Sequence, residues 1–407
     1  MTSFPELGAP SPLPWTNSAT VWRALLALAV VFVMLATTGW TAIRSHRGDP
    51  DPRSASLNAW LHGSLAGHRL PDPNGPPAAL SRFFASLTGG QLDYLVNRYP
   101  LVVGNLNGAP APLRYRANRV ALGRARAIEE KRAHDQRLTP LGRGEANRRM
   151  HRFTSLMREG RQILAFNPAG AGRVAEVFGD LPHADRVSVV VPGVDTTALT
   201  YEKTARSYTA PAGMATALYE AERRTRPAAK TAVIAWADYT SPSGLGMDAA
   251  TGKLAAEGAL RLRAMVRGLP NDARVALFCH SYGSVVCGVA ARDLAAKVSD
   301  IAVAGSPGMR ADRAADLGTA ARIWATRDGD DWIRDVPHME WGGLGHGADP
   351  VSGGFGARVL SAAGAVGHPG YFRPGTTSLE NFARIGVGAA ASVQCASHNT
   401  SCAADLS

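Results

Sequence analysis

Cysteine is scarce in this chain, with four Cys among 407 residues. No Cys or His pair has the spacing of a structural zinc site. Cys279 and Cys287 lie in apolar surroundings, and we expect both to be small buried hydrophobic residues. Cys395 and Cys402 lie in a polar stretch near the C-terminus, where an oxidising compartment would join them in a disulfide. We expect that disulfide to stabilise the fold little, because its loop is short and its surroundings are polar.

Acidic residues are fewer than basic ones, with 33 Asp or Glu against 44 Lys or Arg and a formal net charge of +11. Residues 113–152 hold twelve Lys or Arg and four Asp or Glu, a difference of +8. Such a stretch could meet an anionic partner such as nucleic acid, acidic lipid or envelope polymer. Neither interleaved aromatic residues nor a nucleic-acid motif accompanies these charges. We therefore expect solvated faces of amphipathic helices and no nucleic-acid partner.

Internal repeats are absent, and the 43 Gly and 26 Pro are too few to imply disorder throughout. The length suits one large catalytic domain with appendages. The expected segments are a disordered tail at 1–22, a transmembrane or signal segment at 23–44, a linker at 45–80, a helical region at 81–160, a catalytic domain at 161–390 and a polar tail at 391–407.

Long apolar runs are also rare, and residues 24–43 form one of twenty residues without a charge. That length crosses a bilayer as a helix, and it exceeds the usual core of a cleaved signal peptide. A count of Arg44, Arg47 and Arg53 against Arg23 favours a cytoplasmic large domain. A single N-terminal apolar segment before a large domain is instead the usual layout for export. We expect a single-pass membrane protein, or a secreted one, with its catalytic domain outside the cytoplasm.

The hydrophobic pattern changes from helical to alternating near residue 161. Before it, helices are expected at 81–100, 113–135 and 141–158. After it, short apolar runs typical of buried strands alternate with helical segments. This order predicts an α/β fold with a mostly parallel, doubly wound sheet, which binds ligands at the carboxyl ends of its strands. Strands are expected at 162–166, 173–177, 187–191, 231–236, 275–278, 301–304, 322–326 and 357–361, and helices at 211–224, 254–266, 284–295 and 378–387.

One stretch, residues 274–290, has the pattern of a nucleophile elbow. The apolar run 275–278 leads into Cys-His-Ser-Tyr-Gly, and a helix of small residues follows. In such an elbow a strained turn raises the serine, here Ser281, above the sheet. Small residues are needed two positions before and after the serine. Gly283 meets this need, and Cys279 stands where the motif has glycine.

An activated serine needs a base, and the base needs an orienting acid. After the strand at 322–326, the candidate acids are Asp328, Asp330 and Asp331, and we choose Asp331 because D-x-[I/V] is the usual local form. We choose His368 as base, because a loop before the last helix can carry it over the sheet. His346 is the runner-up. His338 and His398 are also available, and His280 is expected to be structural.

An oxyanion hole completes the expected site. One N–H should come from Tyr282, the residue after the serine, and another from the loop after the strand at 187–191. Val194 is the candidate donor there, since Gly193 lets the backbone turn. These donors would stabilise the charge of a tetrahedral intermediate.

Several strings in a fixed order resemble a known family. They are VVVPGVDT, CHSYGSVV, AGSPGM, DDWI, LGHGADP and GHPGYF, preceded by YPLVVGNLNGAP and RYRANR. Together they resemble an α/β-hydrolase family of unknown function that is widespread in actinobacteria and related in fold to cutinases and lipases. The resemblance covers about residues 81–387 and implies Ser281 as nucleophile, His368 as base and an acid near Asp331.

Two classes of function follow. The first is a serine hydrolase of the esterase or lipase type, without cofactor or metal, acting on a small-molecule or lipid-like ester. The second is an inactive envelope protein that keeps the fold as a binding or scaffold module. A metal-dependent hydrolase using His338, His346 and Asp349 is a third, weaker interpretation.

Overall fold

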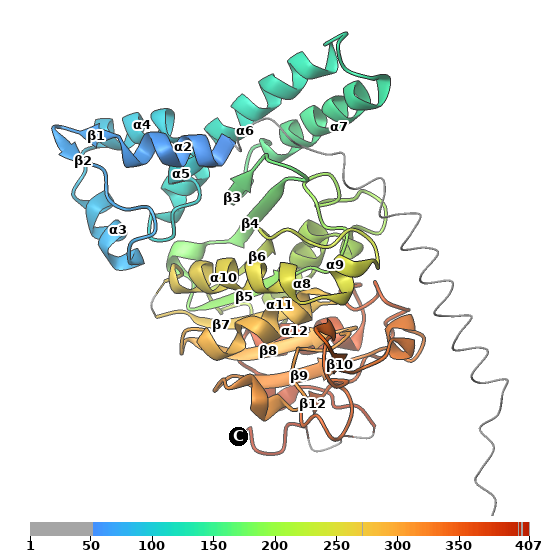
Figure 1. The fold of residues 1–407 in the computed structure, drawn as a ribbon. Coiled ribbons are helices and arrows are strands. Elements are labelled where there is room, and N and C mark those ends of the chain that lie inside the picture. Colours follow the sequence, from blue (N-terminus) through green and yellow to red (C-terminus); the bar gives the residue numbers. More distant parts are fainter. Residues whose placement is uncertain (1–51, 271, 398, 400–401, 407) are drawn as a thin grey trace, which may run out of the picture. The chain divides into compact units, whose positions relative to one another are not determined.

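Eight strands form the central sheet of the computed structural model, which describes residues 52–406 apart from 271, 398, 400 and 401. Their order across the sheet is β12-β9-β8-β7-β5-β6-β4-β3 (Figure 1). Neighbours from β12 to β6 are parallel, and β4 and β3 join antiparallel at one edge. The bounds are β3 Gln162–Asn167, β4 Arg173–Gly179, β5 Arg186–Val191, β6 Thr231–Ala237, β7 Arg274–His280, β8 Val298–Ala304, β9 Arg322–Thr326 and β12 Arg358–Val359.

The mostly parallel sheet expected from the alternating pattern is therefore confirmed. Its central strands are buried on both faces, and every residue of β6 is buried. Such strands have no polar face, which explains why they appear in the sequence as short apolar runs.

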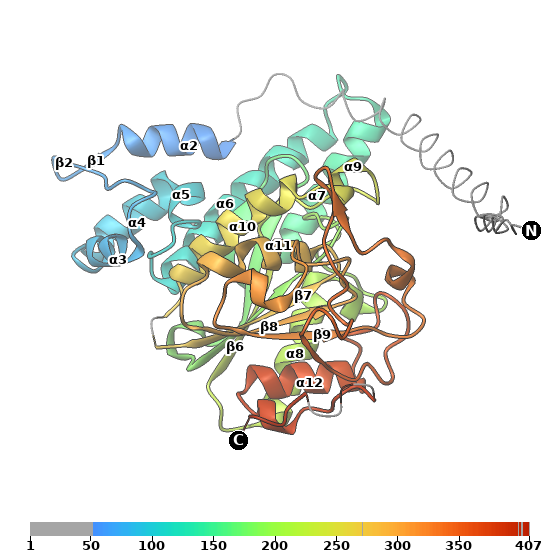
Figure 2. The same cartoon turned by 60° about the horizontal axis from the view of Figure 1, so that its bottom comes forward.

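Helices cover both faces of the sheet (Figure 2). On one face lie α8 (Pro211–Thr225) and α12 (Thr377–Gly386), and on the other lie α10 (Lys253–Arg267) and α11 (Gly283–Ala290). The helix expected at 284–295 is shorter than predicted, because α11 ends at Ala290 and a 3₁₀ turn follows. Smaller elements are α9 (Met247–Ala250) and the hairpin of β10 (Glu340–Trp341) and β11 (Leu344–Gly345).

A mostly helical region, with one short two-stranded hairpin, precedes the sheet and has its own apolar core. The single helix expected at 81–100 is wrong, since α3 ends and Thr88 begins α4 with a capping box. The segment expected as a linker also contains structure, including α2 with its buried Trp60. The elements are α2 Pro52–Leu61, β1 Ser64–Leu65, β2 His68–Arg69, α3 Pro77–Ala85, α4 Gly89–Arg98, α5 Pro100–Val103, α6 Ala111–Ala133 and α7 Pro140–Leu156.

Two buried asparagines attach this helical region to the sheet. The side chain of Asn105 donates to the carbonyl of Phe166 at 2.9 Å, and that of Asn118 donates to the carbonyl of Ile163 at 2.9 Å. Both acceptors lie in β3, the edge strand. Since buried amides need partners, these bonds fix where α5 and α6 meet the sheet.

The basic stretch 113–152 is only partly the solvated face that we expected. Arg149 is buried and donates to Glu129 at 2.8 Å, and Arg114 is buried in the first turn of α6. The periodicity of charge alone could not show this, because the acidic partners lie on other turns and other elements.

The C-terminal tail is packed, contrary to the expectation from its polar sequence. Cys402 is buried and forms a disulfide with Cys395. Arg358 of β12 donates to the carboxylate of Asp405 at 2.6 Å. The predicted disulfide is thus present, but in packed rather than loose surroundings.

The apolar stretch 24–43, expected to form a membrane segment, lies outside the described residues, as does His398. In the part of the chain that is described, every helix is too short or too polar to cross a bilayer.

Candidate active site

Ser281 occupies a sharp turn between β7 and α11. Its φ of +55° lies in the left-handed region, which a non-glycine residue adopts only where its surroundings enforce it. The end of β5 and the residues that follow it lie close to this turn. A Cβ on Gly283 would lie 2.3 Å from the carbonyl oxygen of Val191, and one on Gly193 would lie 2.6 Å from the Cβ of Ser281. Glycine is therefore required at both positions for the turn to fit against β5.

Cys279 and Cys287 form a disulfide across this turn, so the expectation of two unbonded residues is wrong. Cys279 is the last residue but one of β7, two residues before Ser281, and Cys287 lies in α11, which folds back beside the strand. Their Cα atoms are 6.6 Å apart. A spacing of eight residues could not reveal this pairing before the turn was known.

His368 and Asp331 meet Ser281 in space. His368 Nε2 lies 2.8 Å from Ser281 Oγ, and His368 Nδ1 lies 2.9 Å from Asp331 Oδ1. A carboxylate can only accept, so Nδ1 carries the proton and Nε2 is left to accept from the serine hydroxyl. The three residues that the sequence singled out are brought together in the described structure.

Asp331 is fully buried and well partnered. Its Oδ2 accepts from the Tyr371 hydroxyl at 2.5 Å, and its Oδ1 accepts from the backbone N–H of Ile333 at 2.9 Å. Burial alone would raise the pKa of Asp331, but hydrogen bonds from His368 and Tyr371 hold it below its ordinary value. The carboxylate therefore stays ionised beside the imidazole.

The other two candidate acids do not contact His368. Asp328 accepts from the backbone N–H of Gly367 at 2.8 Å, and so holds the loop that carries the histidine. The backbone N–H of Asp330 donates to Asp328 at 3.3 Å in an exposed turn. Tyr371, which also donates to the site, was missed, because nothing in its local sequence distinguishes it from a core residue.

His280 holds the backbone of His368 in place by a hydrogen bond. Its Nε2 donates to the backbone carbonyl of His368 at 2.7 Å, and the two rings are 4.8 Å apart. Burial, followed by the neighbouring His368, lowers the pKa of His280 to about 3. The ring is thus a neutral donor at ordinary pH and holds the backbone of His368.

His346, the runner-up base, lies elsewhere. Its Nε2 donates to the carbonyl of Ala249 at 2.7 Å, and its ring packs on the edge of Tyr282. His338 Nε2 lies 4.0 Å from Asp349. In the described part of the chain, His338, His346 and Asp349 do not converge on a metal-binding position.

The loop after β5 lies against the nucleophile turn through Gly193. Among the described residues, neither the N–H of Val194 nor that of Tyr282 has a hydrogen-bond acceptor. The loop is held from both sides. The Tyr239 hydroxyl donates to the carbonyl of Pro192 at 2.6 Å. The backbone N–H of Asp195 donates to the carbonyl of Pro242 at 2.8 Å.

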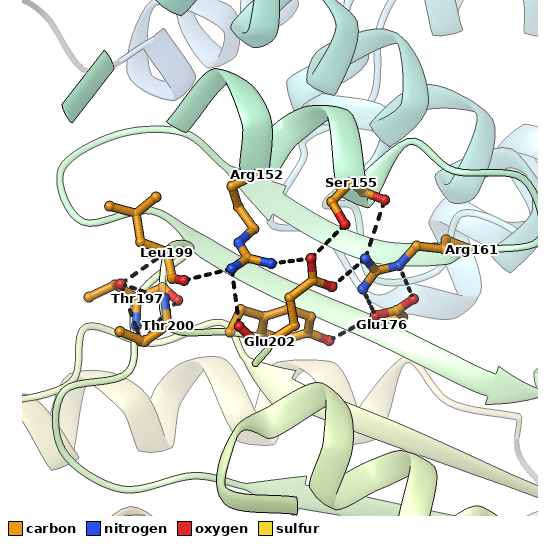
Figure 3. Close-up of polar contacts among 9 residues, drawn as sticks. Arg152, Ser155, Arg161, Glu176, Thr197, Leu199, Thr200 and Glu202 are labelled. Atoms are coloured by element: carbon orange, nitrogen blue, oxygen red, sulfur yellow. Dashed lines mark hydrogen bonds and ion pairs between the residues drawn. The ribbon is translucent and has the colours of Figure 1, made fainter. Parts of the chain in front are cut away.

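Ion pairs hold the far end of the same loop (Figure 3). Glu202 accepts from Arg161 at 2.6 Å and from Ser155 at 2.6 Å, and it pairs with Arg152. Arg152 also donates to the carbonyl of Leu199 at 2.9 Å. The network ties residues 199–202 to α7 and the start of β3, which limits movement of the loop that carries Val194.

Comparisons with known proteins agree with this fold. A family model described as alpha/beta hydrolase matches residues 167–341, a span that includes Ser281 and Asp331 and ends before His368. Comparison with curated proteins finds no match.

Solved structures show a weaker likeness. A dienelactone hydrolase from Anabaena variabilis is 15% identical over 53% of this chain and 88% of its own, with a TM-score of 0.31. An α/β serine hydrolase without lid from Xanthomonas campestris is 14% identical over 56% and 94%, with a TM-score of 0.34. TM-scores this low carry no conclusion about the reaction. The matched segment 167–341, which is less than half of the chain, is thus similar to the α/β-hydrolase family, and the mostly parallel sheet with its serine-bearing turn agrees with that similarity.

Proposed function

We propose that this protein is a serine hydrolase that cleaves an ester or a related acyl bond. The observation that carries the proposal is the pair of contacts at His368, 2.8 Å to Ser281 Oγ and 2.9 Å to Asp331 Oδ1. A serine hydroxyl is a poor nucleophile until a base removes its proton. In the proposed reaction His368 Nε2 is that base, and Asp331 stabilises the imidazolium that forms.

The proposed reaction has two halves. Ser281 Oγ attacks the acyl carbon while His368 takes its proton, and the N–H groups of Tyr282 and Val194 donate to the resulting oxyanion. His368 then protonates the leaving alcohol, which departs and leaves an acyl-enzyme. Water, deprotonated by His368, attacks the same carbon, and collapse releases the carboxylic acid and restores the serine. The free N–H groups of the loop and the turn support this assignment.

Apolar side chains near the histidine support an ester with an apolar group as substrate. Trp332 is 41% exposed, and its ring centre lies 4.8 Å from that of His368. Val366, on the histidine loop, is 64% exposed. A small-molecule or lipid-like ester could cover both while its acyl carbon meets Ser281.

The proposal is tested by hydrolysis of p-nitrophenyl esters of graded chain length. Ser281→Ala and His368→Ala should each lower kcat by about a thousandfold or more, Asp331→Asn should be nearly as damaging, and the double variant should be little worse than either single one. His346→Ala should keep most of the activity. Folded wild-type protein that hydrolyses none of the esters would favour the inactive scaffold, and an active Ser281→Ala would exclude this serine as nucleophile.

We further propose that the catalytic domain works outside the cytoplasm and that residues 24–43 anchor it to the membrane. Two disulfides support an oxidising compartment, and the length of the apolar stretch supports a span. Full-length protein should then stay with membranes on carbonate extraction, whereas a chain starting near Ser54 should be released. A mature protein that begins near residues 39–44 would instead establish a cleaved signal peptide.

A further inference from the structure

A cavity of about 570 Å³ lies between the N-terminal helical region and the sheet, and none of the proposed catalytic residues lines it. Its wall includes α2, the segment around α5 and α6, β3, β4, β6 and α10. We call it the arginine cavity, after Arg114, Arg261 and Arg267 in its wall. A second hollow of about 900 Å³ shares Arg114 and Arg267 with it.

The charge of the arginine cavity is unbalanced. Among the described residues that line it, Asp238 is the single carboxylate. Asp238 is already engaged, because Arg261 donates to its Oδ2 at 2.5 Å and Arg173 lies 3.6 Å from its Oδ1. The second hollow adds Arg82 and no carboxylate. Because Asp238 is paired with Arg261, no carboxylate among the described lining residues is left to balance Arg114 and Arg267.

Among the described residues, Arg114 is the buried arginine of this wall that lacks an acidic partner within hydrogen-bonding distance. Its side chain is 5% exposed, and its Nε donates to the carbonyl of Gly104 at 3.4 Å. Within the described residues, its two Nη atoms have no hydrogen-bond acceptor and no ion pair. Burial lowers the pKa of Arg114 to about 10, although Asp238 and Tyr115 act against that shift. A buried guanidinium without a carboxylate is costly, and an anion in the cavity would compensate it.

The rest of the wall is largely apolar. Leu57 and Leu260 line the cavity with accessible apolar side chains, and Leu260 is 60% exposed. Behind them the wall is formed by buried residues of the two cores, all of which are at most 4% exposed: Val102, Leu106, Leu164, Trp236 and Met265. A small inorganic anion would leave this surface uncovered. A ligand with a charged head and an apolar chain would satisfy both parts of the wall.

We propose that the arginine cavity binds an amphipathic anion, whose phosphate or carboxylate head pairs with Arg114 and Arg267 and whose chain lies against Leu57 and Leu260. The guanidinium fork suits both kinds of head, since each offers two coplanar acceptors. The site is separate from Ser281, and the proposal does not depend on hydrolase activity.

Calorimetric titration of the full-length Ser281→Ala protein tests the proposal, because this background cannot turn the ligand over. The probes are decyl phosphate, decanoate, inorganic phosphate and the neutral decanol, each below its aggregation concentration. Decyl phosphate or decanoate should bind saturably at one site, at least about tenfold more tightly than decanol or inorganic phosphate. The relative affinities of the two amphiphiles show which head the cavity takes.

Variants locate the binding. Arg114→Gln and Arg267→Gln should each weaken it by about tenfold or more, and Ala264→Phe, which fills the cavity without changing charge, should abolish it. Arg313→Gln is the matched control, because Arg313 is exposed and lines neither hollow. If Arg114→Gln does not fold, Arg267→Gln and Ala264→Phe decide.

Three results would overturn the proposal. They are no saturable binding of either anionic amphiphile, equal affinity for decanol, and binding that Arg267→Gln and Ala264→Phe leave unchanged. The last result would also mean that the amphiphile occupies another site, such as the candidate active site at Ser281. Esterase activity of the wild-type protein is measured separately, so either proposal can fail without the other.

Discussion

At the scale of the residue, the geometry of His368 depends on side chains that would not touch a substrate. His280 donates to its backbone carbonyl at 2.7 Å, and Asp328 holds the loop through the N–H of Gly367. We expected His280 to be structural because the turn aims it away from Ser281, and its side chain does point elsewhere. What the sequence could not reveal is that it meets a residue 88 positions away, which only the assembled fold brings near.

Substitution of His280 should therefore affect turnover. His280→Leu removes the donor to the His368 carbonyl, and kcat should fall by about tenfold to a hundredfold while KM changes about twofold or less. His280→Gln keeps an N–H at similar reach and should recover most of the activity, which a purely space-filling role would not explain. His183→Leu, at an exposed position, serves as control. Equal kcat for the His280→Leu and wild-type proteins would contradict a positioning role.

At the scale of the element, the strands were the most predictable part, and the joints between elements the least. Each strand of the sheet was expected within a few residues, because burial on both faces leaves a clear apolar run. The segment around α2 was misjudged because its apolar and polar residues follow no amphipathic pattern, and Trp60 is the one buried residue of the helix. The Cys279–Cys287 bond was missed because it spans a turn whose geometry the spacing does not encode.

Among the elements, α8 should give the fold a pH dependence. Its Glu222 is fully buried against Ser188 of β5 and Gly386 of α12, and burial raises the pKa of Glu222 to about 8. The unfolded chain releases this proton near pH 4.5, the folded protein only near pH 8. Stability from this group is therefore complete below about pH 4.5 and falls as pH rises towards 8.

Glu222→Gln should remove that dependence. Thermal unfolding between pH 5 and 9 should show the wild-type Tm falling relative to that of Glu222→Gln, which becomes the more stable protein at the alkaline end. Glu220→Gln, two residues earlier in α8 and exposed, should follow the wild type. Parallel Tm curves for the wild-type and Glu222→Gln proteins would show that Glu222 is ionised in the fold.

At the scale of the whole molecule, all four cysteines are paired. One bond closes the turn that carries Ser281, and the other fastens the tail beside β12. By loop length, the bond at the turn should contribute about 2–3 kcal/mol to the free energy of unfolding. Both bonds bear on the proposed compartment, because the cytoplasm keeps thiols reduced.

Counting the free thiols of protein from its native host tests whether the domain lies in an oxidising compartment. Denatured, unreduced protein should react with no maleimide, and reduction should expose four thiols. Replacement of Cys279 and Cys287 by Ala should lower Tm more than replacement of Cys395 and Cys402 by Ser, because the first bond lies wholly in the core. Four reactive thiols before reduction would contradict the oxidising compartment and favour a cytoplasmic domain.

The central claim is that Ser281 is a nucleophile activated by His368. The most direct measurement is labelling with a fluorophosphonate, followed by peptide mass spectrometry of the wild-type, Ser281→Ala and His368→Ala proteins. We predict one adduct per chain, carried by Ser281, absent from Ser281→Ala and formed far more slowly in His368→Ala. Folded wild-type protein that takes no label, or that takes it on another residue, would contradict the account.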